Sequence, residues 1–403
     1  MSEEMHSSAP GMDQIGAAEP MPGLIAENLG TPIQLSNVEL DGFAVEAARP
    51  GETIKIWTRL SITSDEPSFH KMAGGLARTI QHYSALAGTP IDLQCAATVL
   101  LIIKRDKSAE LWVDTAAVAV KVLAKRDFDA GSPVLESDIV DIAEMAFPCV
   151  KFEKEDKVVV LFRQDWRFGL FFDFNPGREF SEVAMNRSLG ALLRNLKYRH
   201  IFDTIDNQQV VASLTGAGWF PFAEIITSEF PAIAEACEAK FNLTDVEAKV
   251  LASFDQARLD RMFKRWLSRP ALASREAVLR SAMRSFVADD PIAVMKTVLT
   301  EIEGVLREAY QAIHGTGAKI ETLLEFAVAS AERKAGSPSS LLLPASFAKY
   351  LRDRPFAHFD PSVGLAHASS RHAVGHGMAA PATYTKVGAL QVLLTLDQLA
   401  FAL

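Results

Sequence analysis

The stretch VVVLFRQDWRFGLFFDF, residues 158–174, decides the fold of the first part of this chain. Two apolar and aromatic runs flank Gln164 and Asp165 and end at Asn175-Pro176-Gly177, which predicts a β-hairpin. Upstream, residues 53–62 alternate between apolar and polar side chains, and residues 97–103 form one apolar run. Both patterns are typical of strands. A helical pattern over residues 67–86 lies between them, so this part is predicted to be α+β.

After Gly177 the apolar residues recur at helical spacing instead. Helices are predicted over 181–199, 222–240, 243–268, 274–287, 291–314, 317–335 and 340–353, followed by an amphipathic leucine-rich helix that ends at Leu403. The predicted architecture is an α+β N-terminal domain followed by an all-α C-terminal half. Its parts are a disordered tail (1–30), an α+β domain (31–180), a helical connecting region (181–289) and a helical bundle (290–403).

Composition limits the classes of function. The 403 residues carry a net charge of -9, which argues against broad, non-specific coating of nucleic acid but allows one local cationic pocket. Nothing indicates a preference for DNA. The three cysteines lie far apart and fit buried positions in a reducing compartment. Neither a secretory signal nor a membrane span is predicted, so the expectation is a soluble cytoplasmic protein of bacterial style.

The segment SSRHAVGHG, residues 369–377, carries the candidate chemistry. Arginine grips a phosphate with a fork of donors and keeps its charge, whereas histidine exchanges protons near neutral pH. If the segment is helical, Arg371 and His376 lie about one turn apart. The pair suits RNA cleavage, in which a base removes the 2′-hydroxyl proton and a cation stabilises charge on the phosphate.

This segment resembles the RNA-cleaving helical domains named for higher eukaryotes and prokaryotes nucleotide-binding (HEPN). Their mark is an arginine, a polar residue and a histidine near a terminal helix, here Arg371, His372 and His376. RHAVGHG followed by Tyr384 and the leucine-rich helix is also similar to a group of uncharacterised bacterial proteins, which commonly have asparagine where this chain has Ser370. The resemblance covers residues 290–403.

The resemblance implies a metal-independent endoribonuclease of the toxin or abortive-infection type that works as a homodimer on RNA without a cofactor. By this interpretation Arg371 holds the scissile phosphate and His376 is the general base or acid. His372 orients the substrate or tunes His376, and Tyr384 donates a hydrogen bond to a phosphate. A polar residue of the 291–314 helix, which carries the surface pair Glu303 and Arg307, could face the same pocket.

Several alternatives remain open at this point. Arg371 could cap a helix or form a salt bridge, with His376 hydrogen-bonded in a core. The spacing also occurs at Arg194 with His200, Arg307 with His314 and Arg352 with His358.

His367, His372 and His376 could be metal ligands, although no HExxH glutamate accompanies them. The rival function is a non-catalytic helical interaction or dimerisation protein with a sensing N-terminal domain. The terminal helix could form the dimer contact through Leu390 and Leu394, or pack inside its own bundle.

Overall fold

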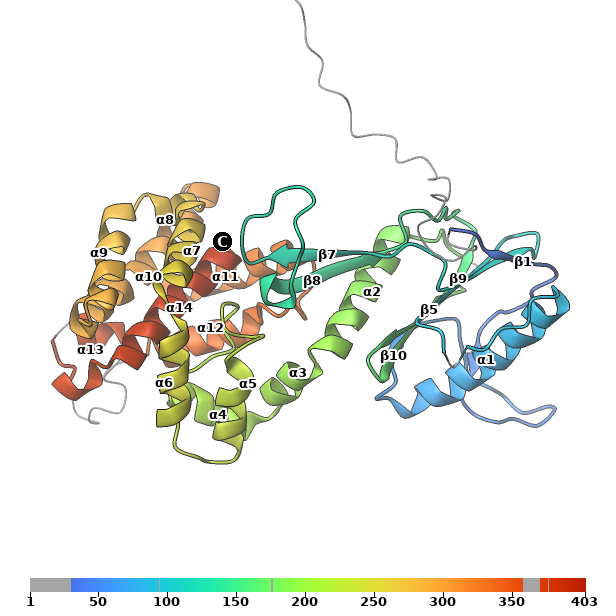
Figure 1. Cartoon of the computed structure of the whole chain (residues 1–403), viewed down its shortest axis with the longest axis horizontal. Helices are drawn as coiled ribbons and strands as arrows, with labels where there is room; N and C mark the ends of the chain where they lie inside the picture. Colours follow the sequence, from blue (N-terminus) through green and yellow to red (C-terminus); the bar gives the residue numbers. More distant parts are fainter. Residues whose placement is uncertain (1–29, 94, 175–176, 358–369, 376) are drawn as a thin grey trace, which may run out of the picture. The chain divides into compact units, whose positions relative to one another are not determined.

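The computed structural model describes residues 30–93, 95–174, 177–357, 370–375 and 377–403. They form an α+β unit (residues up to 119 together with 145–192) and a helical unit (residues 120–144 together with 193–403). The predicted change from strands to helices is confirmed, since the last described strand ends at Asp173 (Figure 1). Apart from residue 30, the predicted tail lies outside the described residues.

The α+β unit is built on a six-stranded antiparallel sheet in the order β1-β6-β5-β9-β10-β4. Its strands are β1 (Ile33–Leu35), β4 (Arg59–Thr63), β5 (Thr98–Ile103), β6 (Ala109–Val113), β9 (Lys157–Gln164) and β10 (Arg167–Asp173). Short strands β2 (Phe43–Ala44) and β3 (Ile56–Trp57) pair separately. The predicted strand over 53–62 is therefore split between β3 and β4.

The predicted hairpin and helix are both confirmed. Strands β9 and β10 pair around a turn in which Asp165 has a φ of 55°. Helix α1 (Pro67–Leu86) buries Phe69, Met72, Leu76 and Ile80, which recur at helical spacing, against the apolar residues of one sheet face. The hairpin rings mostly join the core, because Phe171 and Phe172 are buried, whereas Trp166 is exposed.

The helical unit contains a β-hairpin and most of the helices. Its elements are β7 (Ala119–Ala124), η1 (Glu136–Asp138), β8 (Ile139–Ala146), α3 (Arg199–Asp206), α4 (Gln208–Gly216), α5 (Phe230–Glu238), α6 (Thr244–Ser253), α7 (Gln256–Leu267), α8 (Pro270–Ala273), α9 (Glu276–Val287), α10 (Pro291–His314), α11 (Ile320–Ala335), α12 (Pro344–Asp353), α13 (Arg371–Gly375), η2 (Pro381–Thr383) and α14 (Lys386–Ala402). Helix α2 (Glu182–Lys197) runs from one unit into the other.

Two of the predicted helices are shorter than expected. The helix predicted over 243–268 is interrupted at Phe254 because the Asp255 side chain accepts a hydrogen bond from the Arg258 amide (2.8 Å) and starts α7. The helix predicted over 222–240 begins only at Phe230, after a series of turns.

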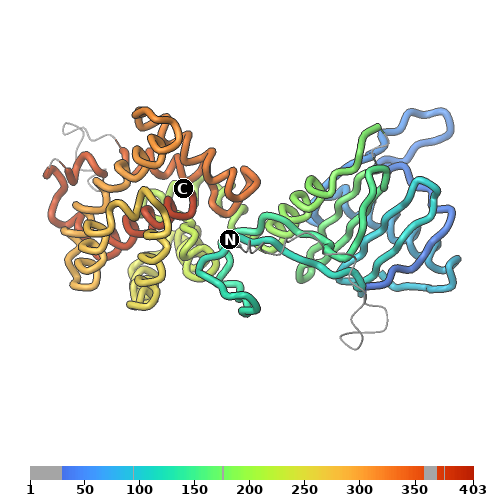
Figure 2. Tube along the Cα trace, turned by 90° about the horizontal axis from the view of Figure 1, so that it is seen from above, coloured from blue at the N-terminus to red at the C-terminus, as the bar shows by residue number. Residues whose placement is uncertain are grey.

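Helix α14 is the centre of the helical unit, and the prediction that it is amphipathic is wrong. Every residue from Ala389 to Ala402 is buried, including Leu390 and Leu394. The helix contacts α6, α7, α9, α10 and α11, which Figure 2 shows grouped around the red C-terminal segment. Its polar side chains have partners: Gln391 donates to the Ala217 carbonyl, and Gln398 accepts from the Ala223 amide. The terminal helix therefore packs inside its own bundle.

The structure divides the chain differently from the predicted boundary at residue 180. The β7–β8 hairpin, predicted to belong to the α+β domain, is part of the helical unit. Polar contacts explain this, because Lys125 Nζ donates to the Glu224 carbonyl (3.2 Å) and Arg265 Nη1 donates to the Lys125 carbonyl (2.6 Å).

The expectation that the cysteines are buried is only partly met: Cys237 is buried, but Cys95 is exposed.

A fully buried ion pair joins β8 to the following helix within the helical unit. Arg194 Nε lies 2.7 Å from Asp141 Oδ1, and the two side chains are 0% and 1% exposed. Arg194 also donates to the Ile142 carbonyl and, over 2.7 Å, to the Ser339 carbonyl. Burial raises the pKa of Asp141 to about 6, and the Arg194 charge opposes this rise without cancelling it.

We therefore expect Asp141 to make the stability of the helical unit depend on pH. In the unfolded chain its pKa is near 3.8, so only the folded chain holds this proton between about pH 4 and pH 6. The contribution to the free energy of unfolding is complete below about pH 4. It falls by at most about 1.4 kcal/mol per pH unit as the pH rises to 6. Urea denaturation at several pH values measures this fall, because asparagine does not titrate and the wild type should lose stability relative to Asp141→Asn as the pH rises from 4 to 6. A constant difference contradicts it.

Candidate functional site

The short helix α13 places Arg371 at its first turn. Ser370, 1% exposed, accepts a hydrogen bond from the Ala373 amide (3.3 Å), and the Arg371 amide donates to the Pro355 carbonyl (2.9 Å). Serine and asparagine both serve at the position before a helix. Ser370 therefore starts the short helix that carries Arg371.

A carboxylate on α10 binds the Arg371 side chain. Glu303 forms an ion pair with Arg371 through one oxygen, and its other oxygen accepts from Arg307 Nε (2.7 Å). The Glu303 side chain is 12% exposed, whereas those of Arg371 and Arg307 are 31% and 49% exposed. Two permanent cations thus flank one buried carboxylate, and the cluster keeps a net positive charge. Glu303 is thus the polar residue of this helix that lies beside Arg371, and it is buried rather than part of a surface pair.

The other predicted site residues are only partly brought together. His372 follows Arg371 on α13 and is half-buried. Tyr384 is half-buried against the helical core, with Lys296 Nζ 6.0 Å from its ring centroid. His376 lies outside the described residues, as does His367. The site is therefore built here from Arg371, His372 and Tyr384.

Helix α10 relates Arg371 to Tyr384. Arg371 contacts Glu303 and Tyr384 contacts Lys296. These two residues of α10 are seven positions apart, which places them on one face of the helix about 10 Å apart along its axis. A cavity of about 320 Å³ lies nearby, lined by Pro355, which bonds the Arg371 amide, and by Thr383 and Thr385 on either side of Tyr384. Among its lining groups are the polar side chains of Glu247, Arg354, Gln391 and Thr395. Arg371 itself is not among the lining residues, and the walls also contain apolar side chains such as Met295 and Leu299.

Other arginine–histidine pairs have a spacing similar to that of Arg371 and His376. Their residues that the structure describes make structural contacts. Arg194 is buried in the pair with Asp141 and is not open to a substrate. His314 stacks on the Tyr310 ring at 4.2 Å, and Arg352 pairs with Glu321. His358 lies outside the described residues.

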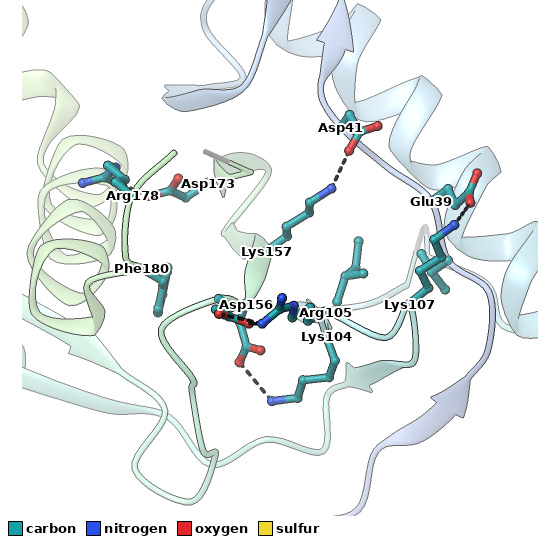
Figure 3. A pocket seen from close by; sticks show the side chains of 13 residues that line it. Glu39, Asp41, Lys104, Arg105, Lys107, Asp156, Lys157, Asp173, Arg178 and Phe180 are labelled. Carbon is teal, nitrogen blue, oxygen red and sulfur yellow. Dashed lines mark hydrogen bonds and ion pairs between the residues drawn. The ribbon is translucent and has the colours of Figure 1, made fainter. Parts of the chain in front are cut away.

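The α+β unit has a separate cavity of about 550 Å³ whose walls are charged but balanced. Figure 3 shows how its cations face carboxylates. The pairs are Lys104 with Asp156 (2.9 Å), Arg105 with Glu155 (3.1 Å), Lys107 with Glu39, Lys157 with Asp41, and Arg178 with Asp173. A cavity of this kind suits a ligand that carries both signs of charge, because such a ligand can exchange ion pairs with the walls.

No group of three or more histidine, cysteine, aspartate or glutamate side chains in the described part of the chain could hold a metal ion. None of its helices combines the length and apolar character needed to span a bilayer. Comparisons of the chain with protein-family models, with curated proteins and with solved structures found no significant match.

Sequence reasoning missed one group of side chains. Arg258, Arg261 and Arg265 recur on α7 at intervals of three and four residues, and Arg269 follows four residues later. That spacing puts basic side chains on one helix face and is readable from the sequence. The hairpin loop beside them was not expected, because β7 and β8 were predicted to lie in the other domain.

Proposed function

We propose that the helical unit is a metal-independent endoribonuclease in which Arg371 binds the scissile phosphate and His376 transfers the proton. The observation that carries the proposal is the Glu303 carboxylate, which binds both Arg371 and Arg307. The Arg371 side chain remains partly exposed in this arrangement. The net positive charge of this cluster favours a phosphodiester. His372 and Tyr384 would contact the substrate. The resemblance to HEPN domains supports the same activity and a bacterial, cytoplasmic, toxin-type or abortive-infection role.

The reaction needs two proton transfers. A base removes the 2′-hydroxyl proton, the O2′ atom forms a bond to phosphorus, and the P–O5′ bond breaks as the leaving oxygen takes a proton. One His376 does not easily serve as both base and acid in a single step. A two-fold homodimer would supply the second histidine. Because Leu390 and Leu394 are buried, the dimer contact would use a surface other than α14.

The full chain is expected to cleave single-stranded RNA in the presence of EDTA. Because the attacking oxygen is the 2′-hydroxyl, the products should be a 2′,3′-cyclic phosphate and a 5′-hydroxyl. Gel analysis of an end-labelled RNA, with chemical identification of the new ends, measures both. An RNA that stays intact, or that is cut only when a divalent metal is added, would contradict the proposal.

The second candidate is a non-catalytic helical interaction protein, and one observation favours it. Glu303 already neutralises part of the Arg371 charge, as an ordinary structural ion pair does. In this case the charged cavity of the α+β unit would be the sensing site. The two candidates separate in the cleavage assay, because the interaction protein leaves RNA intact.

A further inference from the structure

The arginine row of α7 faces the β7–β8 loop across a second cavity of the helical unit. Arg265 Nη1 donates to the Lys125 carbonyl (2.6 Å), and Lys264 pairs with Asp127 (2.6 Å), so loop and helix are tied at two points. The cavity between them has a volume of about 360 Å³. Its basic lining residues are Lys125, Arg126, Arg261, Lys264, Arg265 and Arg269. Among the described residues, the acidic one that lines it is Asp127.

Part of this positive charge has a structural partner. Arg265 is held by Asp397 (2.8 Å) and Glu224 (2.7 Å), and Arg126 is held by Asp138 (2.8 Å). By contrast, the Arg261 side chain makes no hydrogen bond or ion pair within the described part of the chain. Arg269 donates through Nε to the Ala400 carbonyl (2.8 Å), and its two Nη atoms have no described partner. The cavity therefore offers guanidinium donors at both Arg261 and Arg269.

The cations are also crowded. Burial lowers the pKa of Lys125, and the nearby charges of Arg258 and Arg265 lower it further, although Glu224 opposes them. Burial and the Arg265 charge lower the pKa of Arg269. Burial and the Arg269 charge lower the pKa of Lys334 to about 8. A bound anion would relieve this repulsion between like charges.

We propose that this cavity binds a ligand with two or more linked phosphate groups. Arg261 lies within α7 and Arg269 lies two residues beyond the end of that helix, so the cavity presents two separate guanidinium groups, and each can bind a phosphate of its own. Arginine suits phosphate because its planar fork donates two parallel hydrogen bonds and never loses its charge. A structural role explains part of this charge, because Arg269 Nε and Lys334 donate to the carbonyls of Ala400 and Phe401 at the end of α14. That role does not explain the presence of Arg261. Such phosphates occur on free nucleotides and along an RNA strand.

Calorimetric titration of the full chain with inorganic triphosphate tests the proposal. We expect it to bind more tightly than orthophosphate. Arg261→Gln and Arg269→Gln should each weaken binding by about tenfold or more, because each removes charge-assisted hydrogen bonds. Arg261 is exposed, so its replacement should leave the fold intact. Asp127→Asn should tighten binding, since it removes that acidic lining residue. If these residues only stabilised the fold, the arginine and aspartate substitutions would not change the triphosphate affinity in opposite directions.

Arg284→Gln is the matched control, because Arg284 is an exposed arginine on α9 outside this cavity. It should bind triphosphate as the wild type does. Adenosine triphosphate and a single-stranded RNA, titrated into Arg371→Ala protein to silence the other site, distinguish the two sources of phosphate. Whichever of these two ligands binds should bind more weakly when Arg261→Gln is added to the Arg371→Ala protein. The proposal is overturned if neither triphosphate, nucleotide nor RNA binds, or if Arg261→Gln binds them as tightly as the wild type.

Discussion

Replacing Arg371 with alanine is expected to lower the rate of RNA cleavage by about 100-fold or more, because the phosphate loses its cation in the transition state. His376→Ala should cost a similar factor through loss of the proton-transfer group. Arg371→Lys should fall between the wild type and Arg371→Ala, since lysine keeps the charge but loses the fork. Single-turnover cleavage of a labelled RNA measures these rates, and circular dichroism checks that each variant is folded.

Arg352→Ala is the matched control for Arg371→Ala. Arg352 is also a partly exposed arginine of the helical unit that is paired with a glutamate, Glu321. Its replacement should leave cleavage unchanged. Glu303→Gln adds a second comparison, because it leaves Arg371 in place but removes its anchoring charge. We expect kcat to fall while Arg371→Ala remains the slower variant. An Arg371→Ala protein that cleaves as fast as the wild type would place the active site elsewhere.

Asp397→Ala is expected to lower the free energy of unfolding of the helical unit by about 3–5 kcal/mol. Asp397 is 1% exposed and accepts hydrogen bonds from Arg265 (2.8 Å) and Trp266 Nε1 (2.8 Å). Without it, the buried guanidinium keeps only Glu224 as an anionic partner, and the indole N–H loses its acceptor. The linear dependence of unfolding free energy on urea concentration, followed by helical circular dichroism, measures the loss.

Two further variants show whether burial is the cause of that loss. Asp397→Asn keeps an oxygen that can accept from Trp266 and should be less damaging than alanine. Asp353→Ala removes the exposed, one-turn pair with Lys349 and should cost only about 0.5 kcal/mol. Equal losses for Asp397→Ala and Asp353→Ala would mean that the buried network contributes nothing beyond a surface pair.

Much of the fold could be predicted because the deciding signals are local. The hairpin at 158–174 and helix α1 follow from side-chain periodicity alone, and the structure places both as predicted. The break between α6 and α7 was missed because its cause is one side chain, Asp255, whose capping competes with an otherwise continuous helical pattern. The sequence left open whether α14 packs inside its own bundle, and it was predicted to be amphipathic because four polar residues on its surface suggest a solvent-facing side. Their partners, such as Ala217 and Ala223, are more than 170 residues away.

The candidate site was predictable only in part. Residue types and spacing pointed to Arg371, whereas its ion pair with Glu303 of α10 was only one possibility that the sequence left open. The cavity beside α7 was not predictable, because it requires residues 123–127 to lie against Arg261 and Arg269. Such a contact depends on tertiary structure, which no pattern within either segment specifies.

The order in which the chain is synthesised gives the central position of α14 a further consequence. Helices α6, α7 and α9 leave the ribosome before residues 386–402 exist, so their apolar faces lack the helix against which they later pack. The α+β unit, by contrast, has all its strands by Asp173. The nascent helical segments must therefore remain loosely packed, and open to chaperones, until α14 emerges. A ribosome stalled before residue 386 should hold a protease-sensitive second half behind an already folded sheet.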